Sequence, residues 1–195
     1  MGKIVYLMGK SGAGKDTIYK QVLENKDIRL QKIILYTTRP IRSGETDGVE
    51  YFFTDEEGFL KFREKGQLIE DRAYHTCMGM WRYFTVKDEQ IDLENNNYLM
   101  IGTLESFIKT REFFGEDNMI PVMIELDDGI RLQRVLDREK AQDHPRYNEM
   151  CRRFLADEED FSEEKLKEAG ITKKFVNNDL QECLQEIMLY LKRNL

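Results

Sequence analysis

A glycine-rich turn near the amino terminus constrains the fold of this chain more than any other feature. Residues 9–15 read GKSGAGK and match the pattern G-x-x-x-x-G-K. The apolar segment Lys3–Met8 before the turn predicts a buried strand, and Lys15–Leu23 after it has helical character. Main-chain N–H groups in such a loop, at the amino end of a helix, converge on one anion. The order of strand, loop and helix therefore predicts a site for the phosphates of ATP.

We call Gly9–Lys15 the glycine loop. Lys15 has the position of the lysine that bridges the β- and γ-phosphates and stabilises charge during phosphoryl transfer. The ATP-binding residues predicted from this stretch are Gly9, Ser11, Gly12, Ala13, Gly14, Lys15, Asp16 and Thr17.

Asp16 departs from the motif, which has a serine or threonine here whose hydroxyl binds Mg²⁺. Two interpretations remain open. In the first, Asp16 has no role and the Thr17 hydroxyl bonds a phosphate. In the second, the Asp16 carboxylate binds Mg²⁺ directly or through water, because hard oxygen ligands suit this ion.

Further apolar runs predict strands that alternate with helices. The cap positions of two later helices are expected at Thr54 and Asp128. Such alternation over 195 residues indicates one α/β domain, with a parallel sheet of the P-loop NTPase type and helices on both faces. After Lys3–Met8, the expected strands are Ile33–Thr38, Tyr51–Thr54, Tyr98–Gly102, Ile120–Leu126 and Phe175–Val176, with a small antiparallel sheet over Arg72–Val86.

Composition and charge limit the classes of partner. A formal net charge of −7 makes nucleic acid and anionic membranes poor partners. No segment approaches the roughly 20 apolar residues of a membrane span, and no signal peptide is visible. The cysteines are widely separated, which favours reduced thiols, and Cys151 and Cys183 fall in helical patterns typical of a core. We therefore expect a cytoplasmic protein without nucleic-acid or membrane partners.

A second informative stretch runs over residues 37–53 and reads TTRPIRSGETDGVEYFF. Arg39 and Arg42 lie three residues apart on a predicted loop, where forked donors of two arginines can bind one phosphate. Tyr51 can place a hydroxyl on the same anion. Taken alone, these arginines are better explained as part of a solvated basic loop, and only the accompanying motifs favour a phosphate site.

Together with the glycine loop, this stretch resembles the guanylate kinase family. The family signature reads approximately TTR-x-P-R-x-G-E-x-x-G-x-x-Y-x-F. This chain retains both arginines, the Gly-Glu pair, the second glycine, the tyrosine and the phenylalanine, whereas the proline follows Arg39 directly. The resemblance implies transfer of the ATP γ-phosphate to GMP, with Mg²⁺ as cofactor and small-molecule nucleotides as partners.

The resemblance also implies an organisation for the single domain 1–195. The parallel core would comprise residues 1–38 and 88–195, a small inserted acceptor-binding subdomain about 39–87, and a helical lid about 134–153. It leaves open whether the protein is a monomer or a homodimer.

On the acceptor side, the resemblance aligns Glu70, in LIED, with the glutamate that recognises the base, and Gly79 with a glycine beside the acceptor phosphate. The acceptor-binding residues expected from this alignment are Arg39, Arg42, Tyr51, Glu70 and Gly79.

On the ATP side, Arg134 and Arg138 resemble lid arginines, Arg153 a further transition-state arginine, and Asn177 part of the turn near the adenine. Arg131, Arg134 and Arg138 share one face of a predicted helix, which is also compatible with an exposed, salt-bridged helix. The expected catalytic residues are Lys15, Arg39, Arg134, Arg138 and Arg153.

Three departures from the family lie mostly on the acceptor side. Leu35, or Tyr36 if the register shifts by one residue, replaces a serine. Met78 and Met80 replace hydroxyl-bearing residues around Gly79, and the strand Tyr98–Gly102 lacks its terminal acid. Loss of that acid makes Asp16 a more attractive metal ligand. Nearby aromatic residues are compatible either with stacking on a base or with a small hydrophobic core; they are Tyr74, Trp81 and Tyr83.

These departures leave two alternatives to GMP phosphorylation. One is a related P-loop kinase with another nucleotide or a phosphorylated metabolite as acceptor, since a site that loses matched polar groups loses discrimination. The other is a non-catalytic guanylate-kinase-like binding module, against which the intact glycine loop argues.

Overall fold

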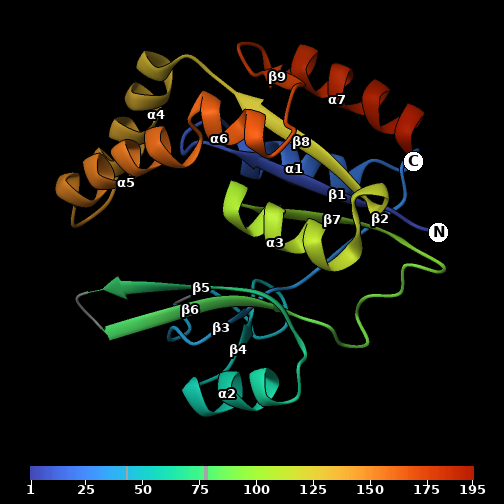
Figure 1. Cartoon of the computed structure of the whole chain (residues 1–195). Helices are drawn as coiled ribbons and strands as arrows, with labels where there is room; N and C mark the ends of the chain where they lie inside the picture. Colours follow the sequence, from blue (N-terminus) through green and yellow to red (C-terminus); the bar gives the residue numbers. More distant parts are fainter. Residues whose placement is uncertain (43, 77–78) are drawn as a thin grey trace.

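Two β-sheets organise the part of the chain that the computed structural model describes, residues 1–42, 44–76 and 79–195 (Figure 1). The first is parallel, with strand order β2-β7-β1-β8-β9, and the second has the order β4-β3-β6-β5. The strands of the first sheet are β1 (Ile4–Gly9), β2 (Leu30–Lys32), β7 (Asn97–Gly102), β8 (Met119–Glu125) and β9 (Lys174–Val176).

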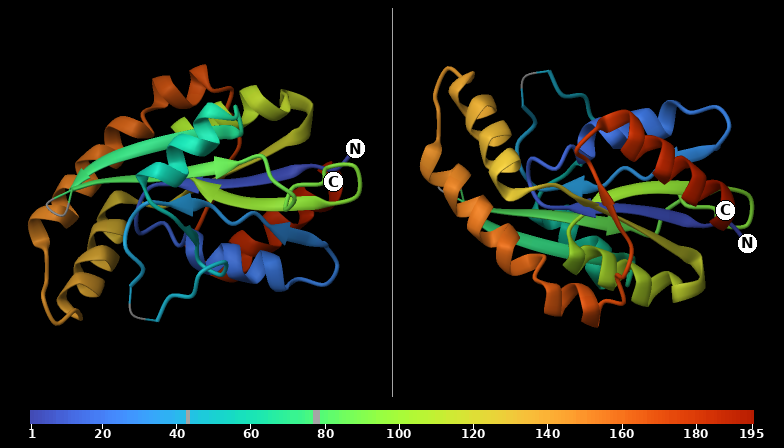
Figure 2. Two further views of the ribbon diagram at one scale, coloured as in Figure 1. Left: turned by 90° about the horizontal axis from the view of Figure 1, so that it is seen from below. Right: turned by 90° about the horizontal axis from the view of Figure 1, so that it is seen from above.

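Seven α-helices and one 3₁₀ helix are present in the described ranges. Helices α4 and α5 stand at one end of the molecule and both chain termini at the other (Figure 2). None of the described helices is long and apolar enough to span a bilayer. The helices are α1 (Lys15–Glu24), α2 (Glu56–Glu64), α3 (Leu104–Phe114), η1 (Glu116–Asn118), α4 (Asp128–Lys140), α5 (Tyr147–Asp160), α6 (Glu163–Glu168) and α7 (Leu180–Asn194).

The central strand β1 is buried on both faces. Val5 and Leu7 point into an apolar cluster with α1 and α7, whereas Ile4, Tyr6 and Met8 point into a second cluster with α3 and α6. This period-2 alternation, with parallel partners β7 and β8 on either side, explains why the strand is apolar throughout. The predicted P-loop NTPase-type parallel sheet with helices on both faces is confirmed.

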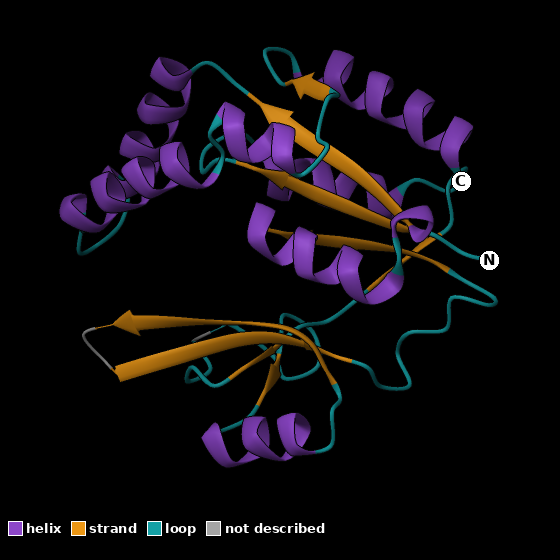
Figure 3. Ribbon diagram, viewed as in Figure 1, coloured by secondary structure: helices purple, strands orange, loops and turns teal. Residues whose placement is uncertain are grey.

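The second sheet consists of strands from the middle of the chain, and the antiparallel pair expected over Arg72–Val86 is present (Figure 3). Phe84 and Val86 on one face pack with Phe59 of α2. On the opposite face, Glu70 and Thr85 are paired across the two long strands and hydrogen-bonded. The strands are β3 (Tyr36–Thr37), β4 (Phe52–Phe53), β5 (Leu68–Thr76) and β6 (Gly79–Val86).

The expectation of one strand over Ile33–Thr38 is wrong. Leu30–Lys32 pairs with β7 in the parallel sheet, and Tyr36–Thr37 belongs to the second sheet. Between them the backbone crosses from one sheet to the other, and the Ile34 N–H donates to the Gln90 side chain at 2.7 Å instead of to a strand. β-branched residues indicate an extended backbone, but they do not say which sheet it joins.

The cap residues of two helices differ by one position from those expected. Asp55, not Thr54, caps α2 by accepting the Gly58 N–H at 2.8 Å. Asp127, not Asp128, caps α4 by accepting the Ile130 N–H at 3.1 Å. Each expected cap has a neighbour that also caps well, so composition alone does not separate the two positions.

The cysteines divide between core and surface. Cys183 is buried against the parallel sheet, as expected, whereas Cys151 on α5 is exposed, so its assignment to the core is wrong. No residue of α5 is fully buried, because this helix covers the end of the sheet instead of a sheet face. Helical periodicity indicates which side of a helix is apolar, not how deeply that side is buried. Cys77 lies outside the described residues.

Candidate nucleotide-binding site

The glycine loop joins the carboxyl end of β1 to the amino end of α1. Gly12 and Gly14 adopt φ values of +82° and +92°, in the left-handed region that side chains disfavour. Within the described residues, no side chain caps the first turn of α1. Its N–H groups are therefore available to an anion, which the helix dipole also favours.

Lys15 begins α1, and its Nζ donates to the Lys10 carbonyl at 2.9 Å. Burial lowers the pKa of Lys15, whereas the carboxylates of Asp157 and Asp16 raise it. The ammonium group is thus held above the glycine loop by a main-chain oxygen, close to two acids from different helices.

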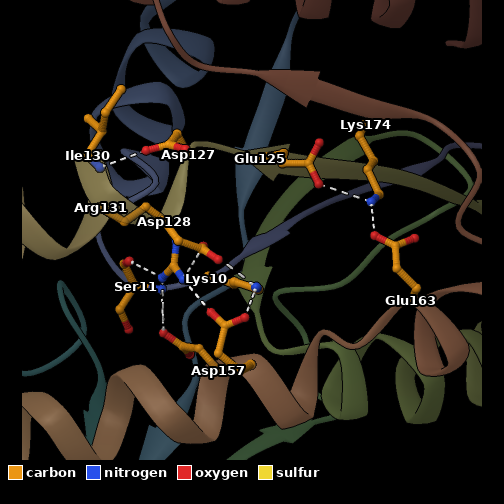
Figure 4. Close-up of polar contacts among 11 residues, drawn as sticks. Lys10, Ser11, Glu125, Asp127, Asp128, Ile130, Arg131, Asp157, Glu163 and Lys174 are labelled. Atoms are coloured by element: carbon orange, nitrogen blue, oxygen red, sulfur yellow. Dashed lines mark hydrogen bonds and ion pairs between the residues drawn. The ribbon is translucent and has the colours of Figure 1, made fainter.

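Helices α4 and α5 contact the glycine loop through an ion-pair network (Figure 4). The Ser11 N–H donates to Asp157 Oδ2 at 2.6 Å, and Lys10 Nζ donates to Glu158 at 2.6 Å. Arg131 is fully buried, donates to the Ser11 carbonyl at 3.0 Å and pairs with Glu158 at 2.5 Å. One loop amide therefore already donates to a carboxylate oxygen, an acceptor of the same charge type as a phosphate oxygen.

Sequence reasoning missed this network. It grouped Arg131 with Arg134 and Arg138, but Arg131 packs over the Phe154 ring at 4.6 Å and also pairs with Asp128 at 2.6 Å. The acidic run at residues 157–160 was the available signal. Whether this acidic run faces α4 depends on the angle between α4 and α5, which the sequence pattern does not specify.

The two expected lid arginines, Arg134 and Arg138, and the expected transition-state arginine, Arg153, are all exposed and differ in placement. Arg134 lies beside Gly14, since a Cβ atom there would come within 3.9 Å of its Nη1. Arg138 is close enough to Lys15 to help lower its pKa. Arg153 instead pairs with Glu149 of its own helix at 2.8 Å.

Asn177 follows β9 and supports the glycine loop from within the core. Its Nδ2 donates to the Ala13 carbonyl at 2.7 Å, and its main-chain N–H donates to the Glu125 carbonyl at 2.9 Å. Its Oδ1 atom is buried and has no hydrogen-bond partner among the described residues. Asn177 therefore contacts the loop directly.

Asp16 and Thr17 are exposed on the first turn of α1, next to Lys15. Among the described residues, no group of three or more His, Cys, Asp or Glu side chains could hold a metal ion. Mg²⁺ commonly takes one or two carboxylates and completes its shell with water and substrate phosphates. A single carboxylate beside the glycine loop suits that mode of binding.

Arg39 is only 3% exposed and is fixed by three kinds of contact. It forms two hydrogen bonds with the Glu45 carboxylate at 2.7 and 2.5 Å, and one with the Pro40 carbonyl at 3.0 Å. Its guanidinium lies 5.0 Å from the Tyr51 ring and 5.3 Å from the Phe53 ring. Within the described residues, two of its five N–H donors remain for a ligand.

The other expected acceptor residues are spread over the second sheet. Arg42 is exposed, and the Tyr51 ring packs against Tyr83, which packs against Tyr74 in turn. Gly79 begins β6 at the exposed end of the hairpin. Met78, which is expected in place of a hydroxyl-bearing residue, lies outside the described residues.

Glu70 is buried in contact with two donors. Its carboxylate accepts from Thr85 Oγ1 at 2.8 Å and from Arg72 at 3.1 and 3.4 Å. Burial raises the pKa of Glu70, and the nearby Arg72 and Thr85 lower it. Sequence reasoning missed Arg72, although residues two apart on a strand share a face.

The Arg39–Glu45 pair yields a testable pH dependence. The Arg39 hydrogen bonds lower the pKa of Glu45 to about 2, whereas an unfolded glutamate titrates near ~4.3. Because the folded pKa is depressed, the stabilisation is present above the unfolded pKa and is lost as pH falls toward 2. We expect the melting-temperature difference between wild type and Glu45→Gln to shrink below about pH 4.3. Thermal unfolding from pH 7 to pH 3 tests this; a difference that stays constant contradicts it.

The central parallel sheet, with a glycine loop between its middle strand and the following helix, defines a P-loop NTPase-type α/β protein. A solved guanylate kinase from Anaplasma phagocytophilum has the same fold, with a TM-score of 0.69 and 20% identity over 98% of this chain and 85% of that one. Residues 1–92 match the guanylate kinase family.

Curated relatives agree with this match. The guanylate kinase of Malacoplasma penetrans is 35% identical over 139 residues, which are 71% of this chain and 58% of that protein. The guanylate kinase of Caldanaerobacter subterraneus is 35% identical over 136 residues, which are 67% of this chain and 64% of that protein. The family match covers the first 92 residues of this chain, and the chain spans less than two thirds of the length of these two relatives.

Proposed function

We propose that the protein transfers the γ-phosphate of ATP to GMP, giving ADP and GDP. The observation that carries the proposal is the position of Lys15, which lies on a glycine loop whose following helix turn has no side-chain cap in the described structure. The match of residues 1–92 to the guanylate kinase family and the guanylate kinase names of the relatives support the choice of GMP.

In this proposal, each expected residue has a role in an in-line transfer. The glycine-loop amides, Asp16, Thr17 and Asn177 bind or support ATP, and Asp16 is the proposed ligand for Mg²⁺, which would neutralise phosphate charge. Arg39, Arg42 and Tyr51 hold the acceptor phosphate, with Gly79 beside it. Since a monophosphate oxygen is already a nucleophile, no general base is needed. The proposed groups that stabilise the spreading negative charge are Lys15, Arg39, Arg134, Arg138 and Arg153.

Each proposed subdomain has one part in this reaction. Residues 39–87 would bind the acceptor, residues 134–153 would act as the lid, and residues 1–38 and 88–195 would form the core. Closure of the lid would exclude water and so suppress hydrolysis of ATP. Ion pairs join Lys10 of the glycine loop to Asp128 and Glu158, which flank the lid segment, and they support a lid attached next to the ATP site.

The proposed partners are small-molecule nucleotides, and the net charge of −7 supports them over nucleic acid. A cytoplasmic location is part of the same proposal, because ATP and nucleoside monophosphates are abundant there.

Steady-state kinetics test the proposed function. We expect ADP formation from ATP and Mg²⁺ to depend on added GMP, and AMP, CMP and UMP to be poor acceptors. ATP binding should be measured in parallel by calorimetry. Binding of ATP without transfer to any of these monophosphates would contradict GMP as the acceptor and favour a related kinase with another acceptor. Absence of ATP binding would favour a non-catalytic binding module.

A further inference from the structure

The buried carboxylate of Glu70 is covered by a second side chain. In its ion pair with Arg72, the Glu70 side chain is 0% exposed and the Arg72 side chain 10% exposed. Oε1 accepts from Thr85 and Arg72 Nη2, and Oε2 accepts from Arg72 Nε. A carboxylate that reads guanine must accept from two N–H groups on the base, which requires both oxygens to be accessible. Of the two side chains, Arg72 is the one that retains exposed surface.

Arg72 lies among the residues proposed to bind the acceptor. It pairs across the sheet with Tyr83, whose ring lies 5.6 Å from the Tyr51 ring, and Tyr51 stacks on Arg39. Arg72 also interacts electrostatically with Tyr6 of β1. Burial raises the pKa of the Tyr6 hydroxyl, and the positive charge of Arg72 lowers it. Arg72 therefore lies between the proposed acceptor-phosphate residues and the central sheet.

The remaining donors of Arg72 define what it can recognise. Nε and one Nη2 hydrogen point to Glu70, so three of its five N–H donors have no partner in that pair. Arginine donates to the O6 and N7 acceptors of guanine and cannot accept from the N1–H or the 2-amino group. Hypoxanthine presents the same O6 and N7 acceptors, whereas adenine presents an amino group at position 6.

Building on the proposed function, we propose that Arg72, not Glu70, reads the acceptor base, through the O6 and N7 edge of a 6-oxopurine. The 2-amino group of guanine then has no partner in the site, and Glu70 orients the guanidinium. The substrate class is 6-oxopurine nucleoside monophosphates, so IMP is an acceptor as well as GMP, and AMP is not.

The test compares kcat/KM for GMP, IMP and AMP at fixed ATP and Mg²⁺. We expect the GMP and IMP values to agree within about tenfold, because an unrecognised amino group contributes little, whereas a lost matched hydrogen bond costs orders of magnitude. Glu70→Gln should leave the GMP-to-IMP ratio unchanged, since its amide oxygen can still accept from Arg72. Arg72→Met should lower kcat/KM for both, and should raise the GMP-to-IMP ratio as the Glu70 carboxylate becomes accessible.

Arg82→Met is the matched control, because Arg82 lies on the opposite face of the same sheet, over the Phe59 ring at 4.2 Å and paired with Glu56. Its GMP-to-IMP ratio should equal that of wild type, and ATP calorimetry on each variant confirms folding. A wild-type preference for GMP over IMP of a hundredfold or more overturns the inference alone. Absence of transfer to every monophosphate overturns the proposed function and this inference together.

Discussion

Replacing Lys15 with methionine should lower kcat/KM for phosphoryl transfer about a thousandfold or more, as loss of a cation at a transferring phosphoryl group commonly does. Methionine keeps the apolar stem of the side chain and removes the charge. Because the ammonium donates only to the Lys10 carbonyl in the described structure and forms no ion pair there, the melting temperature should change little. Steady-state kinetics and thermal unfolding together separate loss of chemistry from loss of fold.

Lys20 provides the matched control for this variant. It is exposed on the same helix, α1, and has no proposed role in the site. Lys20→Met should therefore retain wild-type kinetics. If Lys15→Met kept more than about a tenth of wild-type kcat/KM, the lysine would not contact the transferring phosphate, since even a single lost transition-state donor costs more than this.

The fold was predictable where the local sequence pattern of a strand also determined its place in the sheet. Lys3–Met8 is apolar at every position except the first, and only a strand buried on both faces explains such a run before a glycine loop. Ile33–Thr38 is also rich in residues that favour strands, but the chain changes sheets there. That change depends on Gln90, which lies more than fifty residues away and supplies a side-chain partner for the crossing backbone.

The candidate site was predictable as a set of residues and less so as a set of contacts. The motif identifies Arg39, but not that Glu45, six residues later, would take two of its donors. Likewise, the resemblance selects Glu70, whereas its partner Arg72 lies outside every motif used. Motifs record which side chains a site needs. They do not record which neighbouring residues form hydrogen bonds with those side chains, because these partners depend on rotamers and on strand pairing.

Replacing Gly14 with alanine should both destabilise the protein and weaken ATP binding. Gly14 has φ +92°, and a side chain in the left-handed region costs roughly 1–2 kcal/mol. Its Cβ would also lie 2.3 Å from Asn177 Nδ2, which is buried and donates to the Ala13 carbonyl. Displacing that amide leaves a buried donor unpaired, at a further cost of about 1–3 kcal/mol. The expected total is about 3 kcal/mol of unfolding free energy, or roughly 6–12 °C in melting temperature for a chain of this size.

Gly66→Ala separates the two contributions. Gly66 follows α2 with φ +64°, and a Cβ atom there meets nothing within 4 Å, so only the backbone term remains. This control should lose about 1 kcal/mol and leave the ATP dissociation constant unchanged. Gly14→Ala should raise that constant at least about tenfold, because the shifted loop turns its amides away from the phosphates. Equal melting temperatures for the two variants would show that Asn177 moves aside without a loss of stability. Unchanged ATP affinity in Gly14→Ala would show that the glycine loop does not bind ATP.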